Sequence, residues 1–259
     1  MTRHKDRNRP SPNKDRSDTG GLIWLWGTHA VTAALKNPAR KCRKLLVGPD
    51  ADPEILRLAG RAKAMVEQTD HYTIDRILPR DAVHQGLALH AFPLPEHEVA
   101  AVIDRAKRPC CLVLLDQVTD PHNFGAVIRS AAAFGACGII VQDRHTPPIG
   151  GVLAKAASGA LETVPIIHVV NISRTLEQLG KDGFMRLAFA DGENESLAEV
   201  DLNRDIVLVL GSEGEGIRRL TRENCDVTVR LPTTEAMPSL NVSNAAAVAL
   251  YAWSTAKKV

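Results

Sequence analysis

The chain has 259 residues, of which 44% are hydrophobic and 24% are charged, and its formal net charge is +2. These values are ordinary for a soluble globular protein and leave room for one large domain or two modest ones. No apolar run approaches the roughly 20 residues that a membrane-spanning helix needs. The first residues are basic and polar, without the apolar segment of a secretory signal, so we expect a cytoplasmic protein without a membrane partner.

Cysteine and histidine usage gives no sign of a metal site or a disulfide framework. The chain has 5 cysteines at scattered positions, and neither a Cys-x-x-Cys nor a His-Glu-x-x-His motif occurs. We therefore predict that no metal is bound and that the protein works in a reducing compartment, with most thiols acting as small buried side chains.

The N-terminal segment is a separate, polar part of the chain. Residues 1–20 carry arginines and lysines among Asn, Ser, Pro and Gly. Nothing in this segment can be buried, so we predict a disordered basic tail. Two roles stay open for it: a solubilising tail, or an arm whose cations contact RNA phosphates.

Residues 21–93 predict a small α/β domain. Thr28 is placed to cap its first helix, and Asp52 followed by Pro53 is a typical start for its second. Apolar spacing predicts helices at residues 28–35 and 53–66, and strands at residues 44–48 and 86–91.

Three prolines mark a boundary after this domain. Pro93, Pro95 and Pro109 bracket a polar helix at residues 99–107. Proline-rich polar stretches are typical of linkers, so residues 94–109 are predicted to connect two domains.

From residue 110 onward, apolar strands alternate with helices. We predict strands at residues 112–115, 138–141, 164–169, 185–190, 207–210 and 227–231. Apolar strands between helices indicate an α/β fold with a parallel sheet covered on both faces. Ligands of such sheets bind at the carboxyl ends of the strands, and three polar loops start there.

The first of these loops, residues 116–126, leads into a helix that carries Arg129. The simplest interpretation of Asn123 is a helix cap. Gly125 and Arg129 lie four residues apart and so share one helix face. The start of this helix favours an anion, such as a nucleic-acid phosphate.

The second loop, residues 211–216, reads Gly-Ser-Glu-Gly-Glu-Gly. It lacks the Lys-Ser or Lys-Thr of a phosphate-binding loop, and its glutamates would repel a pyrophosphate. This argues against an NTPase or a nucleotide-dependent dehydrogenase. A carboxylate beside glycines instead suits a ligand that is cationic or rich in hydroxyl and amino groups.

The third loop, residues 239–244, gathers polar side chains at the start of an alanine-rich helix. A capped and tightly packed helix accounts for the alanines. It does not account for so many hydrogen-bond donors and acceptors at one end.

In order and spacing, the three loops resemble motifs one, two and three of the SpoU-type (TrmH-like) RNA 2′-O-ribose methyltransferases of the SPOUT superfamily. The resemblance covers Leu112 to Trp253. Residues 23–91 resemble the substrate-binding domain of the same family, which is similar to ribosomal protein L30e. The residues that carry this second resemblance are Gly27-Thr28-His29-Ala30-Val31 and His84-Gln85-Gly86. The whole chain looks most like the 23S ribosomal RNA guanosine-2′-O-methyltransferases.

The resemblance implies the fold, the cofactor and the site. Residues 110–259 would form a catalytic domain with a deep trefoil knot, and two copies would form a homodimer. S-adenosyl-L-methionine would bind in a bent shape and donate a methyl group to a ribose 2′-hydroxyl of RNA. The implied cofactor contacts are Gly211, Leu231 and Leu240, and the implied catalytic residues are Asn123, Arg129, Glu213, Ser239 and Asn241.

The role of Arg129 is a hypothesis of its own. A guanidinium has a pKa above about 12 and stays charged in proteins, which makes it a poor general base. We expect Arg129 to bind the phosphate beside the target ribose and so to lower the pKa of the 2′-hydroxyl electrostatically.

Two alternatives stay open. A transfer RNA 2′-O-ribose methyltransferase of the same family would share the three loops, although the L30e-like domain favours ribosomal RNA. A non-catalytic RNA-binding scaffold would have lost turnover, against which the five intact catalytic positions weigh.

Overall fold

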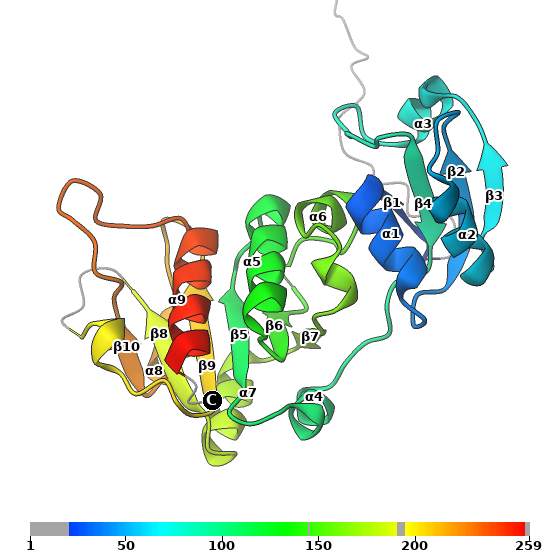
Figure 1. The fold of residues 1–259 in the computed structure, drawn as a ribbon. Coiled ribbons are helices and arrows are strands. Elements are labelled where there is room, and N and C mark those ends of the chain that lie inside the picture. Colours follow the sequence, from blue (N-terminus) through cyan, green and yellow to red (C-terminus); the bar gives the residue numbers. More distant parts are fainter. Residues whose placement is uncertain (1–20, 145, 191–194, 257–259) are drawn as a thin grey trace, which may run out of the picture.

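The chain folds around two β-sheets. The computed structural model describes residues 21–144, 146–190 and 195–256, so the predicted tail at residues 1–20 lies outside the described residues. Residues 23–91 form a four-stranded sheet with its helices, here called the N-terminal unit, and residues 111–256 form a six-stranded sheet with its helices, here called the C-terminal unit. In Figure 1 the two units lie next to each other, with α1 and β1 of the first facing α6 of the second.

The N-terminal unit has a mixed sheet with strand order β1-β4-β2-β3. Its elements are β1 (Ile23–Trp26), α1 (Thr28–Lys36), β2 (Cys42–Val47), α2 (Pro53–Arg61), β3 (Met65–Gln68), α3 (His71–Ile77) and β4 (Leu87–Ala91). β4 runs antiparallel to both β1 and β2, whereas β2 and β3 are parallel.

The two helix starts predicted here have different outcomes. Asp52 caps α2 as predicted, because its side chain accepts a hydrogen bond from the Glu54 amide. The prediction for Thr28 is wrong, since Gly27 occupies the N-cap position without a side-chain bond. The Thr28 amide instead donates to Oε1 of Gln85 at 3.1 Å, so a distant residue satisfies this helix end.

The connection between the units contains a short helix, α4 (Val99–Arg105), two residues shorter than predicted. Val102 and Ile103 of α4 are buried against one face of the six-stranded sheet. This segment therefore packs on the C-terminal unit.

The C-terminal unit is a wholly parallel sheet, as predicted. Its elements are β5 (Cys111–Asp116), α5 (Pro121–Phe134), β6 (Gly138–Gln142), α6 (Gly151–Ala156), the 3-10 turn η1 (Ala160–Glu162), β7 (Ile166–Val169), α7 (Ile172–Lys181), β8 (Met185–Phe189), the 3-10 turn η2 (Leu197–Glu199), β9 (Ile206–Gly211), α8 (Arg219–Glu223), β10 (Val227–Val229) and α9 (Val242–Ala256).

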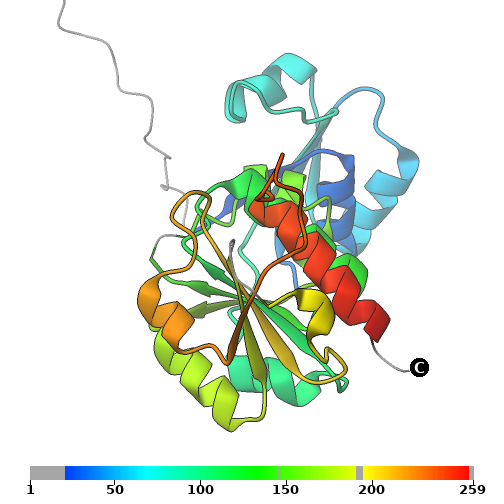
Figure 2. The same cartoon turned by 90° about the vertical axis from the view of Figure 1, so that its left-hand side faces the viewer.

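Both faces of this sheet are buried, which explains its uninterrupted apolar strands. Along β5, Val113 and Leu115 belong to the core that α5 and α9 cover. Leu112 and Leu114 point the other way, into the core that α4 and α7 cover. Figure 2 shows α5 and α9 on one side of the sheet and α7 on the other.

The strand order β10-β8-β9-β5-β6-β7 reverses direction at the centre of the sheet. β5 continues outward through β6 and β7, and the chain then returns so that β9 lies beside β5. Asp116 and Gly211, the last residues of these two strands, are paired in register. Ligand sites of open α/β sheets form at such a reversal, outside the carboxyl ends of the strands.

The cysteines serve as packing groups. All five lie within the described residues, and none of them forms a disulfide. Burial raises the pKa of Cys225 to about 12, and a hydrogen bond to Cys137, together with burial, raises the pKa of Cys110. These two thiols stay protonated at neutral pH and are poor nucleophiles.

Within the described part of the chain, every helix is too short or too polar to cross a membrane.

Candidate active site

In the loop after β5, the Asn123 side chain does not cap the following helix, although its position suggests that role. Asp120 caps α5 instead, because its carboxylate accepts hydrogen bonds from the amides of His122 and Asn123 at 3.1 and 3.2 Å. The interpretation of the Asn123 side chain as a simple cap is therefore wrong. Its carboxamide reaches across to the next loop and donates to Oε1 of Glu213 at 2.9 Å.

Three of the predicted catalytic residues form one hydrogen-bonded cluster. Oε1 of Glu213 accepts from the side-chain amides of both Asn123 and Asn241. The Asn241 amide also donates to Oδ1 of Asn123 at 3.0 Å. These residues are up to 118 positions apart in the chain, so the cluster ties the loop after β5, the loop after β9 and the start of α9 together.

The same Asn241 organises the start of α9. Its Oδ1 accepts from the backbone amide of Ser243 at 2.8 Å and from the Ser243 hydroxyl at 2.6 Å. A capped helix start thus accounts for the Oδ1 atom, while the amide group is left to bind Glu213. Asn241 therefore caps the start of α9 and also takes part in the cluster with Glu213.

The loop after β9 is a closed turn that only glycine permits at its base. Ser212 and Gly216 exchange backbone hydrogen bonds of 3.2 and 3.0 Å. A Cβ atom on Gly211 would lie 2.1 Å from the carbonyl carbon of Gly216 and 2.3 Å from the amide nitrogen of Ile217. The close approach of backbone to backbone therefore fixes the identity of Gly211.

An ion pair that sequence reasoning missed holds the far end of this loop. Asp116, at the end of β5, is fully buried. Its two carboxylate oxygens accept from the backbone amide of Arg218 at 3.1 Å and from its Nε at 2.8 Å. Nη2 of Arg218 also donates to Oε1 of Gln142 at 2.9 Å, so the loop is anchored to both β5 and β6.

A cavity of about 740 Å³ opens beside these loops, at the carboxyl ends of β9 and β10. All three predicted cofactor contacts line it, together with three of the predicted catalytic residues: Gly211, Leu231, Leu240, Glu213, Ser239 and Asn241. Asn123 does not line the cavity itself but reaches its rim through Glu213. The structure thus brings seven of the eight predicted site residues to one place.

Arg129 is the eighth, and it stands apart. It is exposed on α5 and does not line the cavity. Its guanidinium has no ion pair with any residue that the structure describes. An exposed guanidinium without an ion pair is available to an external anion.

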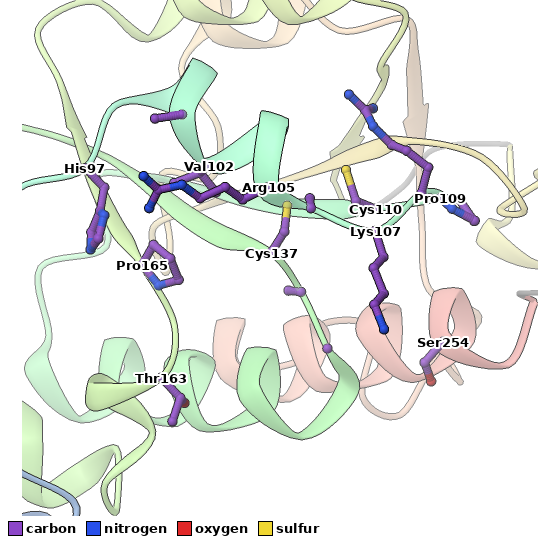
Figure 3. A pocket seen from close by; sticks show the side chains of 15 residues that line it. His97, Val102, Arg105, Lys107, Pro109, Cys110, Cys137, Thr163, Pro165 and Ser254 are labelled. Carbon is purple, nitrogen blue, oxygen red and sulfur yellow. The ribbon is translucent and has the colours of Figure 1, made fainter. Parts of the chain in front are cut away.

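A second hollow, of about 810 Å³, lies at the opposite edge of the sheet, where β5 and β6 begin. Figure 3 shows Arg105 and Lys107 of the connecting segment around it, with Cys110 and Cys137 at its floor. Lys107 extends toward the carboxyl ends of α5 and α9, near Ser254. The partial negative charge of those helix ends attracts the Lys107 cation, so this side chain does not by itself indicate an anion site.

The donor set of the first cavity is that of an organic ligand. Over residues 21–144, 146–190 and 195–256, no three His, Cys, Asp or Glu side chains come together as a metal site. Instead the cavity offers glycine backbone, three leucines, hydroxyl and amide groups, and the carboxylates of Glu213 and Glu215.

Comparison with known proteins agrees with this architecture. Residues 111–251 match the model of the SpoU rRNA methylase family, and residues 24–97 match that of the RNA 2′-O ribose methyltransferase substrate-binding domain. A 23S rRNA (guanosine-2′-O-)-methyltransferase, RlmB of Pseudomonas putida, is 34% identical over 88% of this chain and 94% of its own length. An uncharacterized tRNA/rRNA methyltransferase of Synechocystis is 36% identical over 93% of this chain, which spans only 65% of that protein.

Solved structures share the fold. The SpoU methyltransferase AviRb from Streptomyces viridochromogenes, in complex with AdoMet, superposes with a TM-score of 0.78 at 21% identity, covering 91% of this chain and 90% of that one. An AdoMet-bound rRNA methyltransferase from Sinorhizobium meliloti gives 0.75 at 22% identity, covering 89% and 86%. The resemblance first stated from the three loops is confirmed, and the chain belongs to the SpoU rRNA methylase family.

Proposed function

We propose that this protein transfers the methyl group of S-adenosyl-L-methionine to a ribose 2′-hydroxyl of RNA, with a guanosine of 23S ribosomal RNA as the target. The observation that carries the proposal is the cluster of Asn123, Glu213 and Asn241 at the rim of a glycine-based cavity, at the point where the strand order reverses. The P. putida relative, which matches this chain almost end to end, is named for this reaction.

The cavity fits S-adenosyl-L-methionine in size and chemistry. About 740 Å³ accommodates a nucleoside with an amino-acid tail. Leu231 and Leu240 offer apolar contact to an adenine, and Gly211 lets the ligand approach the backbone. Glu213 and Glu215 favour a cationic ligand, and Arg230 supplies a guanidinium for a carboxylate. When bound, S-adenosyl-L-methionine supplies a methyl group on a positively charged sulfur.

The residues of this chain act by position. The hydrogen bonds among Asn123, Glu213 and Asn241 hold three loops at fixed separations, which keeps the acceptor ribose and the donor cavity aligned. Ser239, on the cavity wall, offers its hydroxyl to the ribose. Arg129 binds the adjacent phosphate, and its charge stabilises the 2′-oxygen as the hydroxyl proton passes to solvent water. The oxygen would form its bond to the methyl carbon as the bond from that carbon to sulfur breaks, which leaves a neutral thioether.

Labelled-methyl transfer to purified RNA tests the proposal. Ribosomal RNA is expected to accept the label and transfer RNA is not, and mapping of 2′-O-methyl positions should give one guanosine. Labelling of transfer RNA alone would favour the transfer RNA alternative. Calorimetry that detects no heat with S-adenosyl-L-methionine would instead favour a non-catalytic scaffold.

Arg129→Lys tests the phosphate role separately. Lysine keeps the positive charge but loses the fork that binds a phosphate through two hydrogen bonds. We expect kcat/KM for RNA to fall at least about tenfold, with S-adenosyl-L-methionine affinity unchanged. Arg174→Lys, an exposed arginine on α7, is the matched control and should retain full activity. Full activity in Arg129→Lys would remove bidentate phosphate binding from the mechanism.

We also infer the arrangement implied by the family. Residues 21–93 would bind RNA, residues 94–109 would link, and residues 110–259 would form a knotted catalytic domain in a cytoplasmic homodimer. The apolar side chains of Val248 and Tyr251, exposed on α9, support such pairing, with the Tyr251 ring 5.8 Å from that of Phe134 on α5. Sedimentation at several concentrations measures the dimer, and a monomer at all of them would exclude it.

A further inference from the structure

A buried ion pair joins the N-terminal unit to the C-terminal unit. Nη2 of Arg40, after α1, lies 2.5 Å from Oε1 of Glu162, at the end of η1, and the two side chains are 0% and 4% exposed. Nε of Arg40 donates to Oε2 of Glu162 at 3.2 Å, so the contact is bidentate. Nη1 donates to the carbonyl of Phe92 at 2.9 Å, just beyond β4.

The carboxylate of Glu162 receives a second residue from the N-terminal unit. Nδ2 of Asn37, the C-cap of α1, donates to Oε2 of Glu162 at 2.8 Å and lies 3.3 Å from its backbone carbonyl. Every one of these bonds to Glu162 crosses between the units. A buried network of charged groups is satisfied in only one geometry, because any shift of one unit relative to the other leaves a buried charge without its partner and without water.

The apolar part of the contact is equally specific. A Cβ atom on Gly151 would lie 1.8 Å from a ring carbon of Trp26, and one on Gly159 would lie 2.8 Å from the methyl group of Ala33. The core is continuous across the boundary, since residues of α1 and β1 share one buried cluster with residues of α6 and η1. The units therefore interlock by shape as well as by charge.

A third contact joins the two units near the start of α1, at the opposite end of this helix from Arg40. Nζ of Lys155, on α6, donates to Oε1 of Gln85 at 2.8 Å, and this oxygen also accepts from the amide of Thr28. Gln85 holds a left-handed backbone with φ of 56°, which is uncommon for a residue other than glycine. Polar contacts thus bracket the apolar contact on both sides.

We propose that Arg40 and Glu162 are positioning residues that fix the N-terminal unit in one orientation before RNA binds. The separation between the RNA-holding face of that unit and the donor cavity then selects which ribose is methylated. This inference rests on the proposed function for its RNA readout. Its structural claim, a docked unit in the free protein, stands independently.

The test compares three variants with the wild type. Glu162→Gln removes the charge but keeps the shape. Arg40→Met combined with Glu162→Leu replaces the pair by apolar groups, which avoids an unpaired buried charge and preserves folding. Asp226→Asn, which breaks the pair with Arg186 inside the C-terminal unit, is the control for loss of an ion pair as such. Each protein is measured by thermal unfolding, small-angle scattering, calorimetry with S-adenosyl-L-methionine, RNA kinetics and mapping of methylated positions.

Both interface variants are expected to lose the fixed orientation of the N-terminal unit relative to the C-terminal unit. We expect a larger radius of gyration, kcat/KM for RNA lower by about 10- to 100-fold, and methylation spread to neighbouring nucleotides. Affinity for S-adenosyl-L-methionine should stay within about twofold, because the cavity is distant from the pair. Asp226→Asn should keep a single product.

Two results would overturn the inference. One is a folded Arg40→Met, Glu162→Leu protein with unchanged radius, RNA kinetics and methylation position. The other is a wild type whose radius of gyration exceeds the value expected for docked units in the oligomeric state that sedimentation gives. If the wild type methylated no RNA at all, the proposed function would fail, while the scattering comparison would still decide whether the pair docks the units.

Discussion

Replacing Gly211 by alanine is expected to weaken the binding of S-adenosyl-L-methionine by about 100-fold while the two units stay folded. The added Cβ atom would lie 2.1 Å from the carbonyl carbon and 2.2 Å from the carbonyl oxygen of Gly216. Both are backbone atoms held by the paired hydrogen bonds between Ser212 and Gly216, so no side-chain rotation relieves the overlap. The loop must move away from β9, and with it the wall that carries Glu213.

The expected size of this effect follows from overpacking. Forced main-chain shifts cost about 1–3 kcal/mol, and the value here should lie near the top of that range. A similar loss at the cavity wall corresponds to an affinity lower by about 100-fold, since each tenfold step is about 1.4 kcal/mol. Urea denaturation measures the first quantity and calorimetry the second.

Gly60→Ala is the matched control for Gly211→Ala. Gly60 lies in α2, and a Cβ atom there would meet nothing within 4 Å. Alanine should stabilise the helix by about 0.5–1 kcal/mol without changing cofactor affinity. If Gly211→Ala bound S-adenosyl-L-methionine as tightly as Gly60→Ala does, the cavity beside β9 would not be the donor site.

Sequence patterns predicted the parts of the fold whose residues carry a repeating physical signal. The strands predicted at residues 112–115 and 207–210 lie within β5 and β9, which are runs of buried apolar residues. The predicted helix at residues 53–66 is wrong at its end, because α2 stops at Arg61 and Met65 and Val66 belong to strand β3. All four residues of β3 are exposed, so no burial pattern marks this strand. The helix α3 was missed because seven residues with one buried side chain give no usable periodicity.

The candidate site was also predictable only in part. The three loops and their order were visible in the sequence, and family resemblance assigned Asn123, Glu213 and Asn241 to one site. Their hydrogen bonds could not be read from spacing, because they join residues 28 to 118 positions apart. The pair of Asp116 and Arg218, 102 positions apart, had no local signal beyond an aspartate at the end of an apolar strand.

That pair leads to the second large effect. Asp116→Ala leaves the Arg218 guanidinium without its carboxylate and frees the loop that follows β9. Removing one partner of a fully buried pair costs about 3–5 kcal/mol. The Arg218 side chain is 39% exposed and can turn toward water, so we expect a smaller loss of about 2–3 kcal/mol in the free energy of unfolding.

Removing the other partner should cost more, and this asymmetry tests the explanation. In Arg218→Ala the carboxylate of Asp116 stays at the end of β5, where it is 0% exposed in the intact pair and cannot turn outward on a long side chain as arginine can. The melting temperature should therefore fall further in Arg218→Ala than in Asp116→Ala, and both should weaken S-adenosyl-L-methionine binding. The exposed neighbour Arg219, paired with Glu223 on the surface, gives the control Arg219→Ala, with an expected change below about 1 kcal/mol. Equal losses in Arg218→Ala and Arg219→Ala would mean that the β5 carboxylate does not hold the loop, and that the cavity owes its shape to Gly211 and the Glu213 cluster alone.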